Sequence, residues 1–210
     1  MEDTSGWSEQ EVRKLKKLNK PCRIQAFLDS LEYKPDISCH SPRTVLRNRR
    51  AHCMEGAIFA AACLELLDYK PLLVDMRAVN DDDHVMAVYK KDGFWGAIAK
   101  SNFNVLRYRE PVYRNIRELV MSYFDLYFNT LGEKTLREYS KPMNLNRFDK
   151  QNWRTTEEDI SFIGDALDDM PHYKILTLKQ KKNLAKADET LMKLALHGAN
   201  HKGVYKPKKS

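Results

Sequence analysis

Apolar residues in the first part of the chain recur at helical spacing. The positions i, i+3, i+4 and i+7 after Pro21 are filled by Ile24, Phe27, Leu28 and Leu31. This spacing predicts an amphipathic helix with one buried face. Four start signals predict helices here and later in the chain: Ser8 with Glu11, Pro21, Ser41-Pro42, and Thr155 with Glu158. The last of these signals predicts a helix over residues 156–168.

The stretch from residue 53 to 66 is apolar on nearly every side. Small side chains and one leucine lie along one side of the predicted helix: Ala57, Ala60, Ala61 and Leu64. Because small residues let neighbouring backbones approach closely, we expect a central, buried helix that begins at Cys53.

Two β segments follow this helix. Residues 72–79 read as one strand, and "HVMAVYKKDGFWGAIA" reads as a hairpin that turns at Asp92-Gly93. With a two-residue turn there, His84 faces Ser101 across the hairpin and Met86 faces Ala99. The middle of the chain therefore predicts a helix packed on a small antiparallel sheet, an α+β fold.

Helical spacing returns beyond Pro111 with an aromatic stripe that we expect to be core: Tyr123, Phe124, Tyr127 and Phe128. Residues 178–196 read as a last amphipathic helix. We therefore expect an α+β domain over residues 1–172, a C-terminal amphipathic helix within residues 173–198, and a basic flexible tail over residues 199–210.

Charge distinguishes the end of the chain from its body. Residues 174–210 hold ten lysines and two acidic residues, whereas the whole chain carries a net charge of +7, so the body is close to neutral. A neutral body argues against a nucleic-acid groove in the core. The lysine-rich tail predicts solubilisation, with a weak polyanion contact as the alternative.

Apolar runs stay far short of the ~20 residues that a membrane span needs, and residues 1–10 lack the apolar core of a signal peptide. We therefore expect a soluble cytoplasmic protein. The four cysteines form no CxxC pair, so reduced thiols are expected.

Cys53 and His84 are the residues that could carry covalent chemistry. A thiol at the start of a helix is favoured as the thiolate by the helix N-terminus, and a histidine can take its proton. His84 opens the strand that follows the acidic turn, where a helix start and a sheet edge can meet. The structural alternatives are a buried filler cysteine and a capping histidine.

Order and spacing add a family resemblance. "HCMEGAIFAAACLELLDYKPLLVDMRAV" and "DDDHVMAVYKKDGFWGAIAKSN" place Cys at a helix start, then a strand, then His at a strand start, then Trp95 in the return strand. This order over residues 45–102 resembles the transglutaminase-like cysteine hydrolase superfamily, which has a papain-like fold. The stretch that follows is similar to uncharacterised bacterial proteins of this type. The resemblance implies acyl-transfer chemistry on a peptide or other amide substrate, with Cys53 and His84 as catalytic residues and no cofactor.

The third catalytic residue departs from the family pattern. The superfamily has an aspartate four residues after the tryptophan, and Ala99 stands there. Asn102 or Ser101 is the candidate replacement: the amide suits the chemistry, and the hairpin register favours Ser101. The Cys53 backbone N–H is expected to bind the oxyanion, with Gln25 as a candidate second donor, although an exposed position on its helix is the simpler role for Gln25.

Other polar clusters have structural interpretations that we prefer. Asp81, Asp82 and Asp83 could bind a hard cation, but read more simply as a solvated turn. The adjacent pairs Cys39-His40 and His52-Cys53 have poor spacing for zinc. The arginines of residues 106–117 could bind an anion, but ion pairs with Glu110 and Glu118 are the expected role.

The leading hypothesis is a thiol-dependent amide hydrolase or acyltransferase. One alternative is a catalytically inactive binding or scaffold protein of the same fold. A third hypothesis, an all-helical interaction module, conflicts with the hairpin signal.

Overall fold

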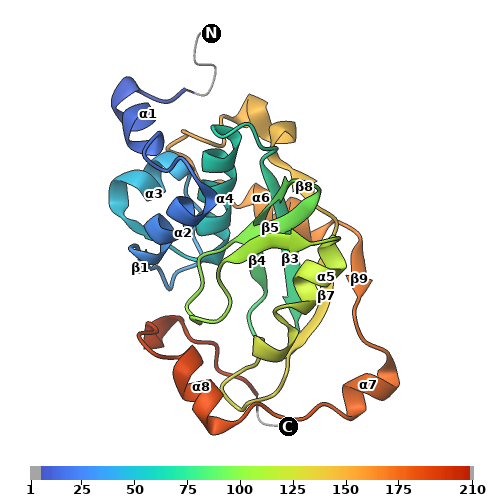
Figure 1. The fold of residues 1–210 in the computed structure, drawn as a ribbon. Helices are drawn as coiled ribbons and strands as arrows, with labels where there is room; N and C mark the ends of the chain where they lie inside the picture. Colours follow the sequence, from blue (N-terminus) through green and yellow to red (C-terminus); the bar gives the residue numbers. More distant parts are fainter. Residues whose placement is uncertain (1–5, 209–210) are drawn as a thin grey trace.

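The computed structural model describes residues 6–208 of the chain. Residues 1–5, which belong to the N-terminal stretch discussed above, and residues 209–210 of the predicted tail lie outside this range. The described chain is an α+β fold in which helices flank a mainly antiparallel sheet (Figure 1). The α+β prediction is confirmed at this level, and the all-helical hypothesis is wrong.

The elements follow one another from an N-terminal helical part to a central sheet and a C-terminal helical part. The α-helices are α1 (Glu9–Leu15), α2 (Pro21–Asp29), α3 (Pro42–Asn48), α4 (Cys53–Glu65), α5 (Ile116–Met121), α6 (Phe162–Asp168), α7 (Leu178–Lys182) and α8 (Glu189–Ala195). The strands are β1 (Glu32–Tyr33), β2 (Arg50–Ala51), β3 (Leu72–Ala78), β4 (His84–Lys91), β5 (Phe94–Ile98), β6 (Arg109–Tyr113), β7 (Leu136–Ser140), β8 (Met143–Asn144) and β9 (His172–Lys174). Short 3₁₀ helices lie at Phe124–Leu126, Leu145–Gln151 and His201–Gly203.

Within residues 6–208 the large sheet has seven strands, in the order β6-β5-β4-β3-β7-β9, with β8 beside β3. The β4–β5 hairpin has the predicted register, with Lys91 opposite Phe94 and Ala87 opposite Ile98. Asp92 and Gly93 both adopt positive φ, as a two-residue turn of this hand requires. The separate pair β1–β2 is parallel.

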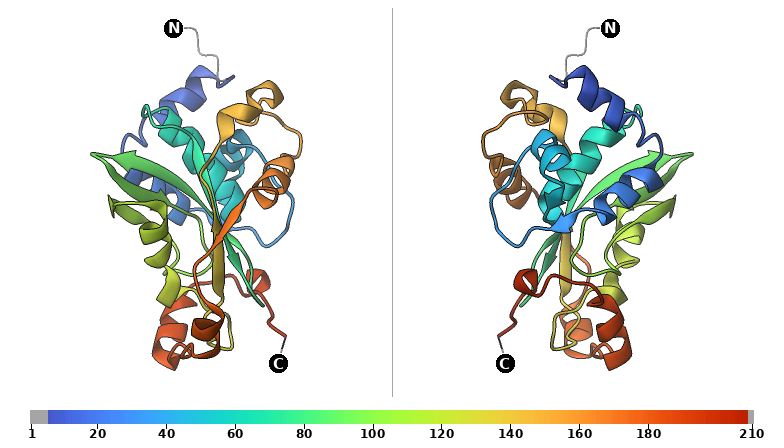
Figure 2. Two further views of the ribbon diagram at one scale, coloured as in Figure 1. Left: turned by 90° about the vertical axis from the view of Figure 1, so that its right-hand side faces the viewer. Right: turned by 90° about the vertical axis from the view of Figure 1, so that its left-hand side faces the viewer.

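The sheet separates two apolar cores. Leu73, Ala87 and Ile98 face the α2–α4 side, while Val74, Met86 and Ala97 face the α5 side. Side chains alternate between the faces of a strand, so both faces of β3 and β4 are buried. In edge-on views the blue-to-teal helices lie on one face and α5 on the other (Figure 2). Helix α4 packs mainly on β4, which brings the start of the helix close to the start of that strand.

The helix starts at Ser8, Pro21, Pro42 and Cys53 are confirmed, including the Ser8–Glu11 capping box. The helix predicted for residues 156–168 begins later, at Phe162. Asp159 accepts hydrogen bonds from the backbone N–H groups of Cys39 and Ser161, so it ties the segment to a distant loop before a helix can start.

The C-terminal predictions need correction. The helix expected over residues 178–196 is two helices, because the N–H of Ala187 bonds the carbonyl of Gly132 and Asp188 caps a new helix. The domain boundary expected at residue 172 falls inside β9, which pairs with β7. The tail expected to be flexible is anchored by hydrogen bonds as far as Lys208.

The aromatic residues of the predicted stripe follow the end of α5, and they are not equally buried. Tyr123, Tyr127 and Phe128 are buried as predicted, whereas Phe124 is half-buried. No helix among residues 6–208 has both the length and the apolar character to cross a bilayer.

Candidate functional site

Cys53 is the first residue of α4, and His52 caps that helix. The backbone N–H of Met54 donates to His52 Nδ1 at 3.2 Å. His52 Nε2 lies 3.1 Å from the Ser38 carbonyl oxygen, which can only accept, so the proton of the His52 ring is on Nε2. The cap fixes the turn from which the Cys53 side chain leaves the helix.

The Cys53 thiol lies against the backbone on both sides of His84. Its Sγ is 4.0 Å from the carbonyl oxygen of Asp83, and the backbone N–H of Val85 is near enough to lower the pKa of the thiol. The side chains of Cys53 and His84 line the same cavity. The structure thus brings together the helix start and the strand start that the sequence predicts to meet.

His84 is held by a backbone group. Its Nε2 lies 2.9 Å from the carbonyl oxygen of Leu106, and the ring meets Tyr127 edge-on with centroids 6.5 Å apart. Because a carbonyl only accepts, Nε2 carries the proton and Nδ1 keeps its lone pair. The imidazole is therefore in the tautomer in which Nδ1 can act as a base.

Burial keeps both groups neutral. It raises the pKa of the Cys53 thiol to about 11, against the lowering effect of the Val85 N–H. Burial likewise lowers the pKa of His84 to about 4, although the Leu106 carbonyl acts in the opposite direction. The thiolate expected from the helix N-terminus is thus not the resting form, since desolvation outweighs the helix-end effect.

Neither candidate third residue contacts the imidazole through a hydrogen bond. Ser101 Oγ accepts from the N–H of Phe103. Asn102 bonds backbone groups of Asn200 and Gly203 in the C-terminal segment. The partner of His84 is the Leu106 carbonyl, which no residue-type pattern could reveal.

The Gln25 side chain is likewise hydrogen-bonded to other groups and not to the Cys53 site. Its amide bonds both the carbonyl and the N–H of Ala99, at 2.9 and 3.1 Å, and it is buried between α2 and the end of β5. The exposed position expected for Gln25 is therefore wrong. Its second amide N–H donates to Asp29 Oδ1 at 2.9 Å, so the amide has no donor left for an oxyanion.

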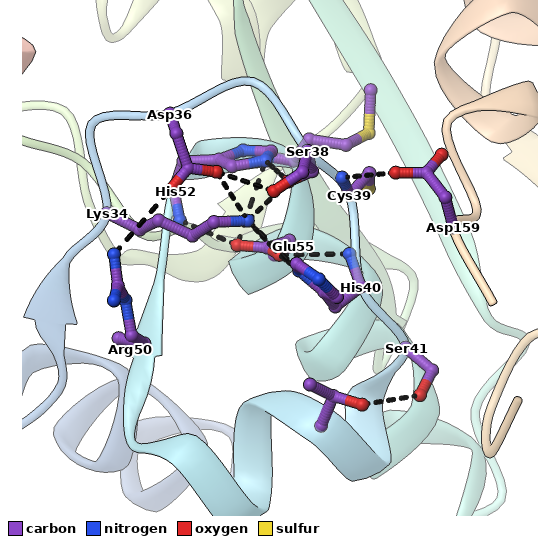
Figure 3. A network of polar contacts seen from close by, with 12 residues as sticks. Lys34, Asp36, Ser38, Cys39, His40, Ser41, Arg50, His52, Glu55 and Asp159 are labelled. Carbon is purple, nitrogen blue, oxygen red and sulfur yellow. Dashed lines mark hydrogen bonds and ion pairs between the residues drawn. The ribbon is translucent and has the colours of Figure 1, made fainter. Parts of the chain in front are cut away.

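A buried ion pair supports the turn that carries Cys53. Lys34 Nζ lies 2.7 Å from Glu55 Oε1, and the side chain of Glu55 is 1% exposed. Glu55 also accepts from the N–H of His40 at 2.9 Å and from the N–H of His52 at 3.2 Å. In Figure 3 the Lys34 side chain extends toward Glu55, with His40 and His52 beside it.

The sequence pattern did not predict this network. Its signal was Glu55 three residues after His52, which is the spacing of a capping box, and the structure has that box. Lys34 gave no signal, because its partner is 21 residues away on another element.

The cavity in front of Cys53 has a volume of about 520 Å³. Five segments contribute most of its lining: residues 33–37, residues 52–54 at the start of α4, the turn 81–85, residues 101–103, and residues 202–205. Ser101 and Asn102 thus line the same cavity as Cys53 and His84. Asp82 and Asp83 of the turn are exposed, and both have pKa values raised first by burial. The cavity therefore joins a thiol, an imidazole and an acidic wall.

Metal binding has limited support. Among the described residues, the one group of His, Cys, Asp and Glu side chains close enough to share a cation is Asp75, Asp83 and Asp168. Asp75 already lies 2.9 Å from His172 and Asp168 lies 3.2 Å from Arg77. Neither the Asp81–Asp83 turn as a unit nor the Cys39-His40 and His52-Cys53 pairs form such a group.

The arginines after residue 106 do not form ion pairs with Glu110 and Glu118 as expected. Arg107 pairs with Asp29 at 3.2 Å, Arg109 lies over the Tyr123 ring, and Arg117 bonds the Ile175 carbonyl. These contacts give each of the three a separate structural role.

Comparison of the chain with protein-family models and with curated proteins finds no match. The function is therefore inferred from the chemistry of the Cys53 cavity.

Proposed function

We propose that the chain is a thiol-dependent amide hydrolase or acyltransferase in which Cys53 is the nucleophile and His84 the general base. The observation that carries the proposal is the tautomer of His84. With its Nε2–H donated to Leu106, the ring keeps the lone pair of Nδ1, and His84 lines the same cavity as Cys53. A central helix starting with Cys, packed on an antiparallel sheet, also supports a transglutaminase-like fold.

In the proposed reaction, His84 Nδ1 takes the proton of the Cys53 thiol as the sulfur attacks the carbonyl carbon of an amide. The oxyanion accepts from the Cys53 backbone N–H at the start of α4. The imidazolium then returns its proton to the leaving amine, which leaves a thioester on Cys53. Water or a second amine attacks the thioester and frees the thiol.

Because Cys53 and His84 are both neutral at rest, the proposed mechanism has no preformed thiolate, and His84 takes the thiol proton during the attack. The Leu106 carbonyl fixes the ring orientation but carries no full charge to stabilise the imidazolium. We therefore expect slower acylation than a Cys-His-Asp triad would give.

A catalytically inactive binding protein is the second candidate. It is favoured by the pKa of about 11 for Cys53 and by Ala99 at the position where the superfamily has its acid. Under this alternative the cavity binds a peptide or amide and releases it unchanged. A weak polyanion contact through the C-terminal lysines stays a separate prediction.

The test is a mass-spectrometric screen of a peptide-amide pool for Cys53-dependent cleavage or amine exchange. We expect products with the wild-type chain and with Cys22→Ser, a matched control because Cys22 is exposed and outside the cavity. Cys53→Ser should give none. Peptides that bind but are returned intact by every variant would favour the inactive candidate.

A further inference from the structure

The C-terminal segment runs along the cavity that holds Cys53. Residues 202–205 line that cavity together with Cys53 and His84. The segment arrives from α8, at the end of the sheet opposite to the N-terminus (Figures 1 and 2). A stretch that the sequence predicts to be a free tail is thus part of the cavity wall.

Two asparagine side chains hold the segment by its backbone. Asn102 donates to the carbonyls of Asn200 and Gly203, at 2.9 and 3.0 Å, and accepts from the N–H of Asn200 at 2.8 Å. Asn80 accepts from the N–H of Lys208 at 2.8 Å and donates to its carbonyl at 2.9 Å. Asn102 thus holds both ends of the 3₁₀ turn His201–Gly203, and hydrogen bonds to the main chain recognise a segment by its backbone conformation.

Gly203 allows the C-terminal segment to lie close to the Tyr33 ring. A Cβ at this position would stand 2.7 Å from the Tyr33 ring, so any larger residue would push the segment away. Asn200 adds a bond to the Tyr33 carbonyl at 3.1 Å. The fit between segment and cavity is therefore steric as well as polar.

The cavity wall and the C-terminal segment carry opposite charges. The cavity wall contains Asp82 and Asp83, which form no ion pair within residues 6–208, whereas its Asp36 is paired with Lys34 at 3.0 Å and with Arg50 at 3.5 Å. The described part of the segment carries Lys202, Lys206 and Lys208. Complementary charge of this kind favours a basic peptide over an acidic one.

We propose that residues 199–208, which form one wall of the cavity in the resting protein, occupy part of a binding site for a lysine-containing peptide with a 3₁₀ turn. The inference that such a peptide is the substrate rests on the proposed function. The binding itself does not, because it needs neither the Cys53 sulfur nor the His84 base. A peptide that uses the same backbone contacts has to displace the C-terminal segment.

The test uses a fluorescent peptide with the sequence of residues 199–208, added to full-length protein. Gly203→Val releases the segment, so we expect it to bind the peptide at least about tenfold more tightly than the wild type, where the attached segment competes. His201→Ala is the matched control, because His201 is exposed and does not line the cavity. It should bind like the wild type.

Asn102→Ala, which removes three hydrogen bonds to the segment without adding bulk, is the second releasing variant. A peptide with Glu in place of all three lysines should bind at least about tenfold more weakly to either releasing variant. Equal binding of the basic peptide to wild type and to both releasing variants, or no binding to any of them, would overturn the proposal.

The same titrations in a Cys53→Ser background separate this proposal from the proposed function. Binding there without any catalysis by the parent chain would refute only the enzyme. Catalysis by the parent chain without peptide binding would refute only the docking site.

Discussion

His84 is held by the carbonyl of Leu106, a group that every amino acid has. The residue types near Ala99 indicate only side-chain partners, Ser101 and Asn102, because a sequence pattern carries no information on which backbone carbonyl a ring will meet. Cys53 and His84 themselves could be predicted, since helix start, strand start and hairpin register each have a sequence signal. The loop that brings residue 106 to residue 84 has no such signal.

The buried imidazole makes stability depend on pH. Its pKa is lowered to about 4, so unfolded chains take up the His84 proton below pH 6.5 while the folded protein does not. This costs the wild type roughly 3 kcal/mol of unfolding free energy as pH falls from 6.5 to 4. His84→Gln should lack this loss.

Urea unfolding of both proteins across this pH range measures the effect. The comparison has to be between variant and wild type, because Asp75 and Asp81, with pKa values raised to about 6, contribute in the opposite direction in both proteins. A constant difference between the two proteins would show that His84 is not buried as a neutral ring.

The raised pKa of Cys53 predicts slow alkylation at neutral pH. The thiolate is the reactive form, so the rate at Cys53 should keep rising up to pH about 11. At pH 7.5 the exposed Cys22 should label faster than Cys53. Iodoacetamide pulses with peptide mass spectrometry measure both rates, and a plateau for Cys53 below pH 8.5 would instead reveal a resting thiolate.

Helix α4 carries the proposed nucleophile, and its first turn depends on Glu55. Glu55→Gln would leave the buried ammonium of Lys34 with the exposed Asp36, 3.0 Å away, as its remaining carboxylate partner. We expect a loss of about 3 kcal/mol of unfolding free energy, because the change removes the buried partner of a desolvated charge. Chemical denaturation measures this loss.

Lys34→Met combined with Glu55→Gln is the matched control, because it removes both charges. The double variant should recover part of the stability that Glu55→Gln loses. If the double variant is less stable than Glu55→Gln, the Lys34 charge is not the cause.

Gly56 shows how tightly α4 packs on the loop that follows β5. A Cβ at residue 56 would stand 2.3 Å from the Cβ of Lys100. Gly56→Ala should therefore destabilise the protein by ~1–3 kcal/mol, although alanine favours helix. Gly164→Ala, whose added Cβ would meet only the flexible end of Met54, is the control in the same thermal melt.

At the scale of the whole molecule, the sequence predicts those elements whose structure depends on residues close to them in the chain. The β4–β5 hairpin has the expected register because Asp92-Gly93 permits only a tight turn. Strands β7 and β9 were missed, because each is short and is stabilised by pairing with distant residues. The break between α7 and α8 depends on Gly132, some 55 residues earlier in the chain, so helical periodicity alone could not predict it.

The proposed function depends on one chemical event, the transfer of the Cys53 proton to His84 as the sulfur attacks a carbonyl. Acylation by the p-nitrophenyl ester of N-acetylglycine, followed by intact-mass spectrometry, tests this event directly. We predict one acyl group on Cys53, formed ~10²–10⁴-fold more slowly in His84→Gln and at an unchanged rate in Cys22→Ser. Acylation of Cys53 at the same rate with and without the imidazole would contradict the account.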